Sequence, residues 1–460
     1  MIQTECGIFS IISKKYNTSN EVLYNLKKLQ HRGRESFGIS WFYDKIVNNK
    51  KYIGIIEDKY INENLLDNSN NTIYSKNWIG HVRYSTSGSL QKLHFTQPIV
   101  SYKYNFSLAH NGNIPFSIWS KINKKFNYTI SNDDVTDTYI LYGFIEYMLN
   151  KNNDMLEIIK YIIQNIEGVY CLLISTHNST YICRDRFGVR PICYCYDSNN
   201  IYVASESCAL DNKLKHNDVE PGEIIHIDNE SLEISNIYKY NDVNYKFCIF
   251  EFIYFMKDES MINTLYVKTF KEYIGKILAE QYLKTINNNS NDYIVCGIPN
   301  SGLIYGTSFA KYTNFKYEQF LQRKNNYNLR TFILKTNKQR LDACKQKYEI
   351  SIDIKNKKII LIDDSIVRGN TLKYLITLIK SYNPKEIHFV VACPPIKYTC
   401  SYGVDFADIE DLIANKMSVD EMIKFYNLDS LLYLDIEQIK NINLSTNNFC
   451  NACFSGNYLF

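Results

Sequence analysis

The strand pattern of the chain changes near its middle, and this change constrains the fold most strongly. In the first half, short strand-like runs are interrupted by two helical patterns, at residues 21–30 and from about residue 134 to 149. The strand-like runs are Trp78–Arg83, Phe106–His110, Gly168–Ser175, Thr180–Arg184 and Ile201–Ser205. Clusters of strands kept apart from helices are typical of a layered α+β domain.

In the second half, largely apolar runs without clean alternation occur at Tyr293–Ile298, Lys358–Ile362 and Glu386–Ala392. Such runs are typical of strands buried on both faces. The first two are followed by glycine-containing loops and helical patterns, which predicts a parallel, doubly wound α/β sheet. The polar stretch Tyr238–Tyr245 separates the two patterns. We therefore expect one domain over residues 6–240 and a second over residues 241–460.

Charge and composition exclude several classes of protein. The chain has 52 Lys and Arg against 48 Asp and Glu, a net charge of +4 without a dense basic run, which argues against nucleic acid as the main partner. The longest apolar stretch, around Phe247–Met256, is broken by Glu251 and is too short to span a bilayer. Met1–Glu5 lacks the pattern of a secretory leader. With 13 scattered cysteines, expected to be free thiols or ligands, the chain is predicted to be cytoplasmic.

The first group of candidate site residues begins at Cys6. Taken alone, Cys6 is either a buried thiol or, once the residues before it are removed, a nucleophile whose own α-amine accepts the thiol proton. Asn111 and the Gly112 N–H could stabilise an oxyanion. Arg83 and Asp137 suit the carboxylate and ammonium groups of an amino acid, although each taken singly could be a surface arginine or a helix cap.

The segments around these residues resemble the glutaminase domain of the N-terminal-nucleophile amidotransferases. They are His31-Arg32-Gly33, Gly80–Ser85 and His110–Asn113, and Arg184–Pro191 with Ser205–Ser207 continue the similarity to about residue 225. The resemblance implies a four-layered αββα fold and a propeptide at residues 1–5. It implies Cys6 as the nucleophile, Arg83 and Asp137 as glutamine-binding residues, and Asn111 with Gly112 as the oxyanion hole.

The second group of candidate residues follows a buried strand. Asp363 and Asp364 come directly after four apolar residues, at the end of the strand where open α/β sheets bind ligands. The next turn offers Ser365, Gly369, Thr371 and backbone N–H groups at a helix N-terminus, which can hold an anion. This pattern predicts a sugar phosphate site, and the alternative is a pair of acids that caps the next helix.

This segment resembles the phosphoribosyl pyrophosphate (PRPP) motif of type I phosphoribosyltransferases, and its order Asp-Asp-Ser-Ile-Val-Arg-Gly resembles the amidophosphoribosyltransferase family. That resemblance runs from Cys6 through nearly the whole chain. It implies PRPP binding and Mg²⁺ near Asp363, Asp364 and Ser301. The PRPP-binding residues it implies are Asp363, Asp364, Ser365, Arg368, Gly369, Thr371, Tyr327 and Arg330. The chain departs from the family pattern at Asn300, Lys271, Lys335 and Asn337.

The family resemblance also implies the reaction. Glutamine would be hydrolysed at Cys6, and its ammonia would displace pyrophosphate from PRPP to give 5-phosphoribosylamine, the first step of purine biosynthesis. It further implies feedback inhibition by purine nucleotides and a homo-oligomer, a tetramer in the family. Two alternatives are a glutaminase with another acceptor, against which Asp363-Asp364 argues, and a nonenzymatic purine sensor, which would need a DNA-binding module.

A third group of candidate residues consists of cysteines. Cys450 and Cys453 form a CxxC pair, which is a natural chelating unit but needs two further ligands. On ligand type alone, four thiolates suit an iron–sulfur cluster and structural zinc equally. The resemblance to the iron–sulfur branch of the family implies a 4Fe–4S cluster with Cys248 and Cys400 as the other ligands, and Cys393 is a rival to Cys400.

Overall fold

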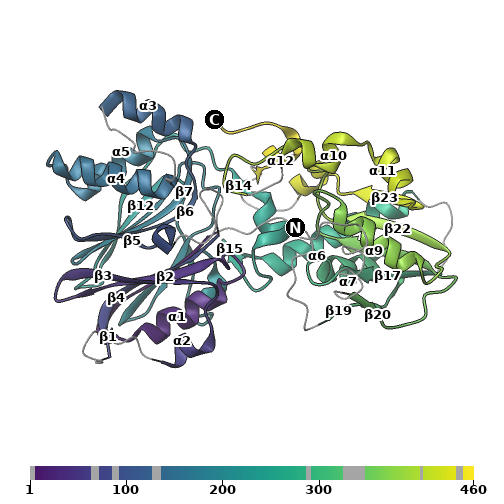
Figure 1. Ribbon diagram of the computed structural model, residues 1–460, viewed down its shortest axis with the longest axis horizontal. Helices are drawn as coiled ribbons and strands as arrows, with labels where there is room; N and C mark the ends of the chain where they lie inside the picture. Colours follow the sequence, from purple (N-terminus) through teal and green to yellow (C-terminus); the bar gives the residue numbers. More distant parts are fainter. Residues whose placement is uncertain are drawn as a thin grey trace.

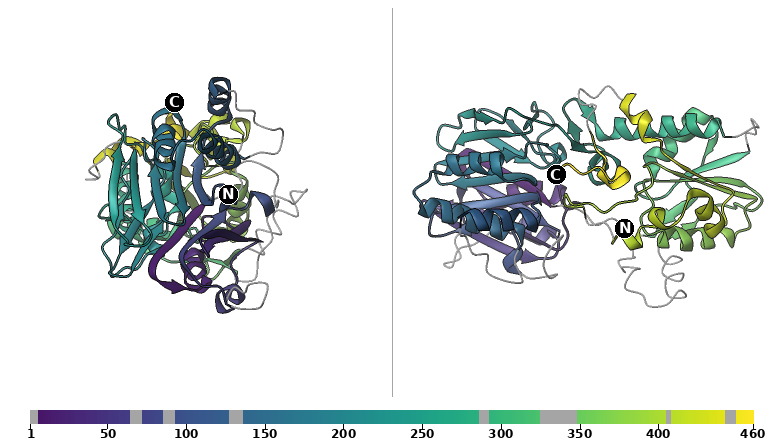
Figure 2. Two further views of the ribbon diagram at one scale, coloured as in Figure 1. Left: turned by 90° about the vertical axis from the view of Figure 1, so that its left-hand side faces the viewer. Right: turned by 90° about the horizontal axis from the view of Figure 1, so that it is seen from above.

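The computed structural model describes residues 6–63, 72–84, 93–126, 136–285, 292–324, 348–404, 408–441 and 449–460. The chain forms two lobes, with its first half in one lobe and most of its second half in the other (Figure 1). The C-terminal segment lies between the two lobes, as the view from above shows (Figure 2). Among these residues, no helix combines the length and the apolar character that crossing a bilayer requires.

The first lobe contains two sheets, in which neighbouring strands run antiparallel. Within the described ranges, the larger sheet has the order β11 (Asn217–Asp218), β9 (Cys193–Tyr196), β10 (Asn200–Ala204), β1 (Gly7–Asn17), β4 (Ser75–Arg83), β2 (Ser36–Tyr43) and β3 (Ile46–Ile53). The smaller sheet has the order β13 (Ile234–Lys239), β12 (Glu223–Asp228), β8 (Ser179–Arg184), β7 (Val169–Thr176), β6 (Phe106–Asn113) and β5 (Ile99–Ser101).

Helices cover the outer face of each sheet. The larger sheet is covered by α1 (Ser19–Lys28) and α2 (Asp58–Asn62). The smaller sheet is covered by α3 (Phe116–Phe126), α4 (Asp137–Asn150) and α5 (Met155–Asn165). Strand β1 shows how the layers arise, because Phe9 and Ile11 join the core under α1 whereas Ile8 and Ile12 join the core between the sheets. The predicted four-layered αββα fold is therefore confirmed.

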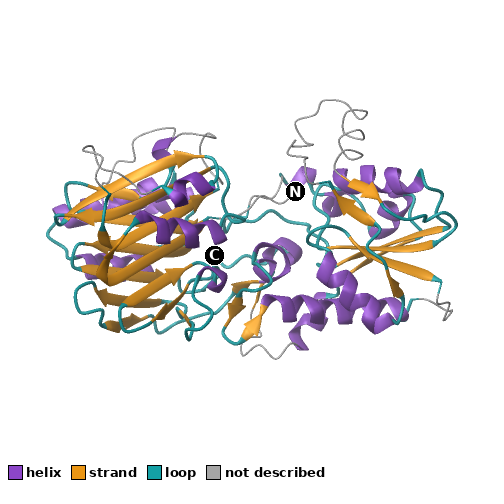
Figure 3. Cartoon of the chain, turned by 90° about the horizontal axis from the view of Figure 1, so that it is seen from below, coloured by secondary structure: helices purple, strands orange, loops and turns teal. Residues whose placement is uncertain are grey.

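The second lobe is built on a parallel sheet. Its described strands have the order β18 (Lys316–Tyr317), β17 (Tyr293–Gly297), β21 (Lys358–Asp363), β22 (Glu386–Val391) and β23 (Ser430–Tyr433), and every adjacent pair is parallel. The longer helices of this lobe are α6 (Val267–Leu283), α7 (Leu303–Thr313), α9 (Asn370–Lys380) and α11 (Val419–Tyr426), which Figure 1 labels. Helices flank the strands of this lobe (Figure 3). The predicted α/β sheet is confirmed, because the three apolar runs form its central strands.

Short elements complete the second lobe and the junction. They are β14 (Phe247–Cys248), a π-helix at Glu251–Phe255, β15 (Met261–Ile262), β16 (Leu265–Tyr266), β19 (Leu321–Arg323), β20 (Tyr348–Ile350), α10 (Ile413–Lys416), β24 (Phe449–Cys450) and α12 (Ala452–Ser455), with 3₁₀ turns at Ile409–Asp411 and Ile436–Asn441. The first lobe has 3₁₀ turns at Leu93–Phe95 and Ser207–Ala209. Strand β13 ends at Lys239 and β14 begins at Phe247, so the polar stretch Tyr238–Tyr245 spans the connection.

The C-terminal segment returns to the beginning of the second lobe. Strand β24 pairs in parallel with β14, and Cys450 stands opposite Cys248 in that pair. Farther on, the Phe460 ring lies 5.7 Å from the Phe187 ring of the first lobe. The end of the chain therefore contacts both lobes (Figure 2).

Candidate active sites

Cys6 immediately precedes β1, which lies between β10 and β4 in the larger sheet. Its Sγ donates to the Tyr84 carbonyl at 3.5 Å. Burial raises the pKa of the Cys6 thiol to about 11; the Tyr84 contact and the Arg83 charge oppose this shift, and Asp137 and Glu35 add to it. The thiol is therefore protonated at neutral pH, and nucleophilic attack requires a base that removes its proton.

The residues predicted to surround Cys6 come from both sheets and one helix. Arg83 ends β4, Asn111 and Gly112 lie in β6, and Asp137 begins α4. Arg83 is 4% exposed, which excludes the surface alternative. The cap of α4 is the Thr136 side chain, which accepts from the Tyr139 N–H, and this excludes the capping alternative for Asp137. Charges on Arg83 and Asp137 both affect the Cys6 thiol, so these groups lie near it.

The oxyanion-hole candidates have distinctive surroundings. Asn111 is 1% exposed, and within the described part of the chain its Nδ2 has no hydrogen-bond partner. A buried amide donor without a partner is costly unless a bound group accepts from it. Gly112 has φ +150°, and a Cβ there would lie 2.0 Å from the Val169 carbonyl oxygen. Only glycine fits at this position, beside an amide donor that a ligand can satisfy.

Asp137 is held by the structure around it. Its Oδ2 accepts from the Ile114 N–H at 3.1 Å, and its Oδ1 accepts from the Thr138 N–H at 2.8 Å. The Nδ1 of His110 lies 3.8 Å from Oδ2, and burial lowers the pKa of His110 while Asp137 opposes that shift. Asp137 therefore presents a fixed negative charge near Cys6.

Sequence reasoning missed Glu35. Its side chain is 7% exposed, and its Oε2 lies 3.8 Å from Nη1 of Arg83. Glu35 is the last residue of the run His31-Arg32-Gly33-Arg34-Glu35, which was the available signal, but nothing in the sequence indicates that its carboxylate is buried. It adds a second acid to the surroundings of Cys6.

The second candidate site lies at the carboxyl end of β21. Asp363 is the last residue of that strand, and Asp364, 4% exposed, follows it. The Asp364 carboxylate accepts hydrogen bonds from the hydroxyls of Ser301 and Ser365, the latter at 2.5 Å. The Ile298 N–H donates to the Ile362 carbonyl at 2.8 Å, which holds the loop after β17 beside β21. The predicted residues Ser301, Asp363 and Asp364 are thus brought together.

The loop between β21 and α9 ends at Gly369, which has φ +70° and occupies the cap position of α9. The acid pair stands several residues earlier, so the alternative in which it caps the helix is wrong. A Cβ at Gly369 would lie 1.8 Å from the Tyr426 hydroxyl, and the positive φ also favours glycine there. Thr371 lies in the first turn of α9, and Arg368 forms a half-exposed ion pair with Asp411 at 3.4 Å.

Of the remaining predicted positions, four lie outside the described residues and two lie within them. Tyr327, Arg330, Lys335 and Asn337 lie outside the described residues. Asn300 follows Pro299 through a cis peptide bond in the loop after β17. Lys271 is 6% exposed and donates to Asp258 Oδ1 at 2.7 Å, so this departure from the family pattern keeps a buried positive charge in an ion pair.

The π-helix lies beside the second site. Burial raises the pKa of Tyr254, a residue of that helix, and the charges of Asp364 and Asp363 raise it further. The Tyr305 hydroxyl donates to the Ile253 carbonyl at 2.8 Å, which ties the same helix to α7.

The predicted cysteine ligands come from three segments that meet at the lobe junction. Cys248 stands opposite Cys450 in the β14–β24 pair. The Lys397 and Tyr398 N–H groups both donate to the Cys453 carbonyl at 3.0 Å, which brings the segment before Cys400 to the same place. Burial raises the pKa of Cys453 well above its ordinary value, and the charges of Cys248, Cys400, Cys450 and Cys393 contribute in that order.

Cys393 is the weakest of these neighbours in its effect on Cys453. Burial raises its own pKa, and the next contributions come from Asp364 and Asp363, so this thiol lies toward the second site. The surroundings of Cys393 thus differ from those of the four predicted ligands. Across the described ranges, no three His, Cys, Asp or Glu side chains are gathered as they would be around a single metal ion.

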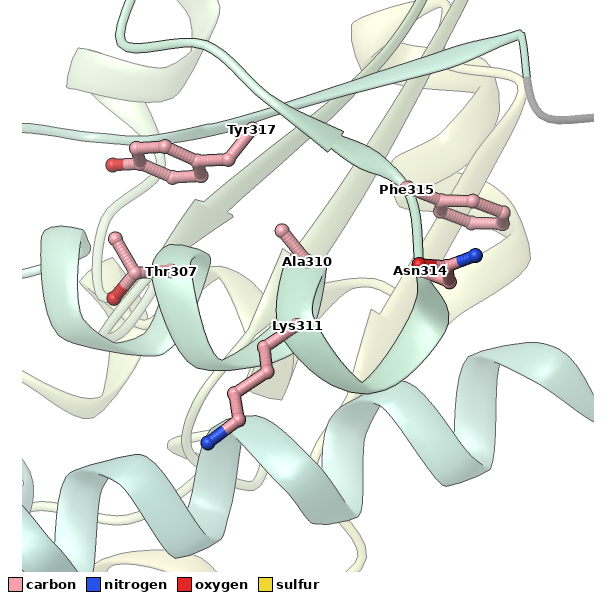
Figure 4. Close-up of a pocket in the computed structure, with 6 residues that line it drawn as sticks. All are labelled: Thr307, Ala310, Lys311, Asn314, Phe315 and Tyr317. Carbon is pink, nitrogen blue, oxygen red and sulfur yellow. The ribbon is translucent and has the colours of Figure 1, made fainter.

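A shallow hollow on the second lobe contains none of the predicted site residues. It is formed by α7 and the segment that follows this helix (Figure 4). The residues that line it are Thr307, Ala310, Lys311, Asn314, Phe315 and Tyr317. We assign no function to it.

Comparisons with known proteins agree with the two-lobed arrangement. A glutamine amidotransferase domain family matches residues 81–212, and a phosphoribosyl transferase domain family matches residues 268–412. The amidophosphoribosyltransferase of Methanocaldococcus jannaschii is 33% identical, over 98% of this chain and 97% of the relative. That of Bacillus subtilis is 30% identical, over 99% of this chain and 94% of the relative.

A solved structure gives the same result for the fold. The glutamine PRPP amidotransferase from B. subtilis, complexed with ADP and GMP, superimposes with a TM-score of 0.83 at 28% identity. The match covers 99% of this chain and 97% of that chain. The similarity therefore extends over both lobes and their relative placement.

Proposed function

The chain belongs to the amidophosphoribosyltransferase family, whose enzymes catalyse the first step of purine biosynthesis, and from this premise we propose how its own residues share the work. The first lobe would release ammonia from glutamine, and the second would transfer that ammonia to PRPP. The observation that carries this proposal is the pairing of two sites in one chain. A partly buried cysteine lies beside Arg83 and Asp137, and two acids stand at the end of a parallel strand.

At the first site, Cys6 Sγ attacks the side-chain amide carbon of glutamine. We assign the base to the α-amine of Cys6, which becomes free when residues 1–5 are removed and has an ordinary pKa near 8. Asn111 Nδ2 and the Gly112 N–H stabilise the oxyanion, and the unpartnered amide of Asn111 supports this role. Ammonia leaves with the transferred proton, and water hydrolyses the thioester to glutamate.

Recognition of glutamine at this site requires charges of both signs. The Arg83 guanidinium would bind the α-carboxylate, and the Asp137 carboxylate would bind the α-ammonium group. The fixed position of Asp137, held by the Ile114 and Thr138 N–H groups, supports this assignment.

At the second site, ammonia attacks C1 of PRPP, and the C1–O bond to pyrophosphate breaks. Asp363 and Asp364 would bind the ribose hydroxyls, and the loop from Ser365 through Gly369 to Thr371 would bind the 5′-phosphate at the start of α9. Arg368, Tyr327 and Arg330 are proposed to contact PRPP as well. These assignments are supported by the position of the acids at the end of β21.

Mg²⁺ is proposed at the same site, where it would neutralise charge on pyrophosphate as that group leaves. Carboxylate and hydroxyl oxygens are the ligands that Mg²⁺ prefers, and Asp363, Asp364 and Ser301 supply them. The hydrogen bond from the Ser301 hydroxyl to Asp364 supports the grouping.

A 4Fe–4S cluster is proposed on Cys248, Cys400, Cys450 and Cys453. Four thiolates suit such a cluster, and the convergence of three chain segments at these residues fits it. A cubane holds its four ligands farther apart than a single zinc ion does, because four irons and four sulfides fill the space between them. The cluster would be structural, since neither half-reaction transfers electrons.

Feedback inhibition and oligomeric state are proposed from the family. The B. subtilis enzyme forms a complex with ADP and GMP, which supports purine nucleotides as inhibitors of this enzyme. We propose a homo-oligomer, a tetramer as in the family. We also propose a cytoplasmic location, which the many thiols support.

The experiment that tests the proposed function supplies anaerobically purified protein with glutamine, PRPP and Mg²⁺. Phosphoribosylamine is then trapped and identified. Parallel reactions replace PRPP with a hexose phosphate, or replace glutamine with an ammonium salt. Phosphoribosylamine from PRPP alone among the acceptors supports the proposal, and turnover of the hexose phosphate contradicts it. Specific binding of labelled operator DNA without turnover would instead support a sensor.

A further inference from the structure

Four charged side chains with almost no exposure meet where the two lobes join. Arg32, Arg190 and Glu206 belong to the first lobe, whereas Glu251 begins the π-helix of the second lobe. Glu251 is fully buried, and each of the other three is 1% exposed. Two positive and two negative groups thus balance one another in a place that water does not reach.

Both carboxylate oxygens of Glu251 accept hydrogen bonds from the Arg32 guanidinium. Arg32 Nη2 donates to Oε1 at 2.8 Å, and Arg32 Nη1 donates to Oε2 at 3.0 Å. Nη1 also donates to Glu206 Oε1 at 2.6 Å. Paired, charge-assisted hydrogen bonds of this kind fix the orientation of a guanidinium as well as stabilising it.

The third nitrogen of the same guanidinium contacts the main chain of Cys6. Arg32 Nε donates to the main-chain carbonyl oxygen of Cys6 at 3.0 Å. Because the guanidinium is planar and its N–H groups point in fixed directions, an anchor on Nη1 and Nη2 also fixes the direction of Nε–H. The Cys6 main chain is therefore held by an arginine whose own orientation depends on a carboxylate of the other lobe.

The packing around Arg32 restricts its side chain to this position. A Cβ at Gly33, the next residue, would lie 2.6 Å from the Val82 carbonyl carbon, so the turn that carries Arg32 packs directly on β4. Glu251 is itself held by Arg190, whose Nη1 donates to Oε1 at 3.2 Å. Arg190 Nη2 donates to the Tyr402 carbonyl at 2.7 Å, which fixes Arg190 to the second lobe.

We propose that Glu251 is a positioning residue for glutamine hydrolysis: from the second lobe, it orients Arg32, which holds the Cys6 main chain for attack on the amide. This inference rests on the proposed function, because it takes Cys6 as the nucleophile. Glu251 does not touch the substrate. Its loss leaves glutamine binding at Arg83 and Asp137 in place and misplaces the nucleophile.

The test measures Glu251→Gln, which keeps the size of the side chain and removes its charge. We expect kcat for glutamine hydrolysis to fall about tenfold to a hundredfold, the range expected for a buried, charged hydrogen-bond partner. KM for glutamine should change by less than about threefold, since uniform binding is retained. Synthesis of phosphoribosylamine from ammonium salts should continue. Glu259→Gln, which alters an exposed acid of the same segment, is the matched control and should retain both activities.

A double-mutant cycle separates this role from a general loss of packing. If Glu251 acts through Arg32, then Glu251→Gln combined with Arg32→Lys should lose no more kcat than Arg32→Lys alone. Additive losses, or equal losses of the glutamine- and ammonia-dependent reactions, would overturn the inference. If Glu251→Gln does not fold, Glu251→Asp replaces it: the charge remains, the shorter side chain withdraws from Arg32, and an unchanged kcat overturns the inference.

Measuring the wild-type enzyme as well shows which of the two proposals a negative result contradicts. Absence of glutamine hydrolysis in the wild-type enzyme would contradict the proposed function itself. A wild-type enzyme that hydrolyses glutamine, together with a Glu251→Gln variant of the same kcat, would contradict only the positioning role.

Discussion

Cys6 is partly buried, and this burial opposes the ionisation on which the reactivity of its thiol depends. With a pKa of about 11 in these surroundings, roughly one thiol in ten thousand is ionised at pH 7. Attack therefore depends on a base that accepts the proton during the reaction. An α-amine on Cys6 itself would be such a base, which is why we propose that residues 1–5 are removed.

Replacement of the nucleophile should separate the two half-reactions. We expect Cys6→Ala to reduce glutamine-dependent synthesis to below about one-hundredth, because no other group supplies the thioester. Synthesis from ammonium salts should remain, since ammonia can enter the second site from solvent. Cys195→Ala, which alters a core thiol on β9, is the control and should keep both activities. Loss of ammonia-dependent synthesis in folded Cys6→Ala protein would contradict the separation of the sites.

At this scale, the sequence predicted residues whose chemistry is distinctive and missed those whose role depends on burial. The positions of Cys6, Arg83 and Asp137 near one another could be expected from their motifs. The buried carboxylate of Glu35 beside Arg83 could not, because the same residue in an exposed turn would give the same sequence. Burial is decided by segments far apart in the chain.

Among the elements, β21 and the loop after it determine the second site. Four apolar residues bury the strand, and its parallel neighbours β17 and β22 end at the same edge of the sheet. The loop after β17 is held there by the Ile298–Ile362 hydrogen bond. The acids Asp363 and Asp364 therefore lie where two loops converge.

Neutralising either acid should weaken the reaction with PRPP. We expect Asp363→Asn and Asp364→Asn each to raise KM for PRPP or lower kcat by about tenfold to a hundredfold, since a hydrogen bond to a charged group contributes roughly 1.5–3 kcal/mol. Glutamine hydrolysis measured without PRPP should change little. Asp353→Asn, an exposed acid of the same lobe, serves as the control. Unaltered PRPP kinetics in both variants would show that this motif has another role.

Elements with a distinct hydrophobic pattern could be predicted from the sequence, and those without one could not. The central strands β17, β21 and β22 were predicted, because short continuous apolar runs are typical of parallel strands buried on both faces. The π-helix at Glu251–Phe255 was not, because five residues within an apolar stretch show no period. Its buried glutamate becomes understandable only when Arg32 and Arg190 from the other lobe are seen beside it.

Over the whole molecule, the end of the chain connects the parts. Strand β24 pairs with β14 at the beginning of the second lobe, and Phe460 packs near Phe187 of the first lobe. The four predicted cysteine ligands lie where these segments meet. A cluster on them would stabilise the junction rather than one lobe.

Removal of a cluster ligand should therefore affect folding more than chemistry. Protein prepared without oxygen should be brown and contain about four irons and four sulfides per chain, since four thiolates complete one cubane. Cys450→Ser should yield poorly folded protein, whereas Cys296→Ser, at a thiol outside the group, should keep the colour. One equivalent of zinc in colourless, active protein would contradict the choice of metal. Full activity of metal-free Cys450→Ser protein would contradict the site.

The buried charges at the junction should make stability depend on acidity. Burial opposes the ionisation of Glu206, but the charges of His31 and Arg32 hold its pKa well below the ordinary value of 4.5. The ionised carboxylate thus stabilises the fold above pH 4.5, and this stabilisation is lost as the pH falls further. Glu206→Gln should lose about 3–5 kcal/mol at pH 7 and show a shallower loss below pH 4.5. Thermal unfolding between pH 7 and 3 tests this, and parallel curves for the two proteins would contradict it.

The central claim is that one chain couples glutamine hydrolysis in its first lobe to amination of PRPP in its second. The most direct measurement follows glutamate and pyrophosphate together, in one reaction of the purified enzyme with glutamine, PRPP and Mg²⁺. We predict that the two products appear in equal amounts throughout the time course and that Cys6→Ala abolishes both. Glutamate release without pyrophosphate at saturating PRPP, or pyrophosphate release that persists in Cys6→Ala with glutamine as the sole nitrogen source, would contradict it.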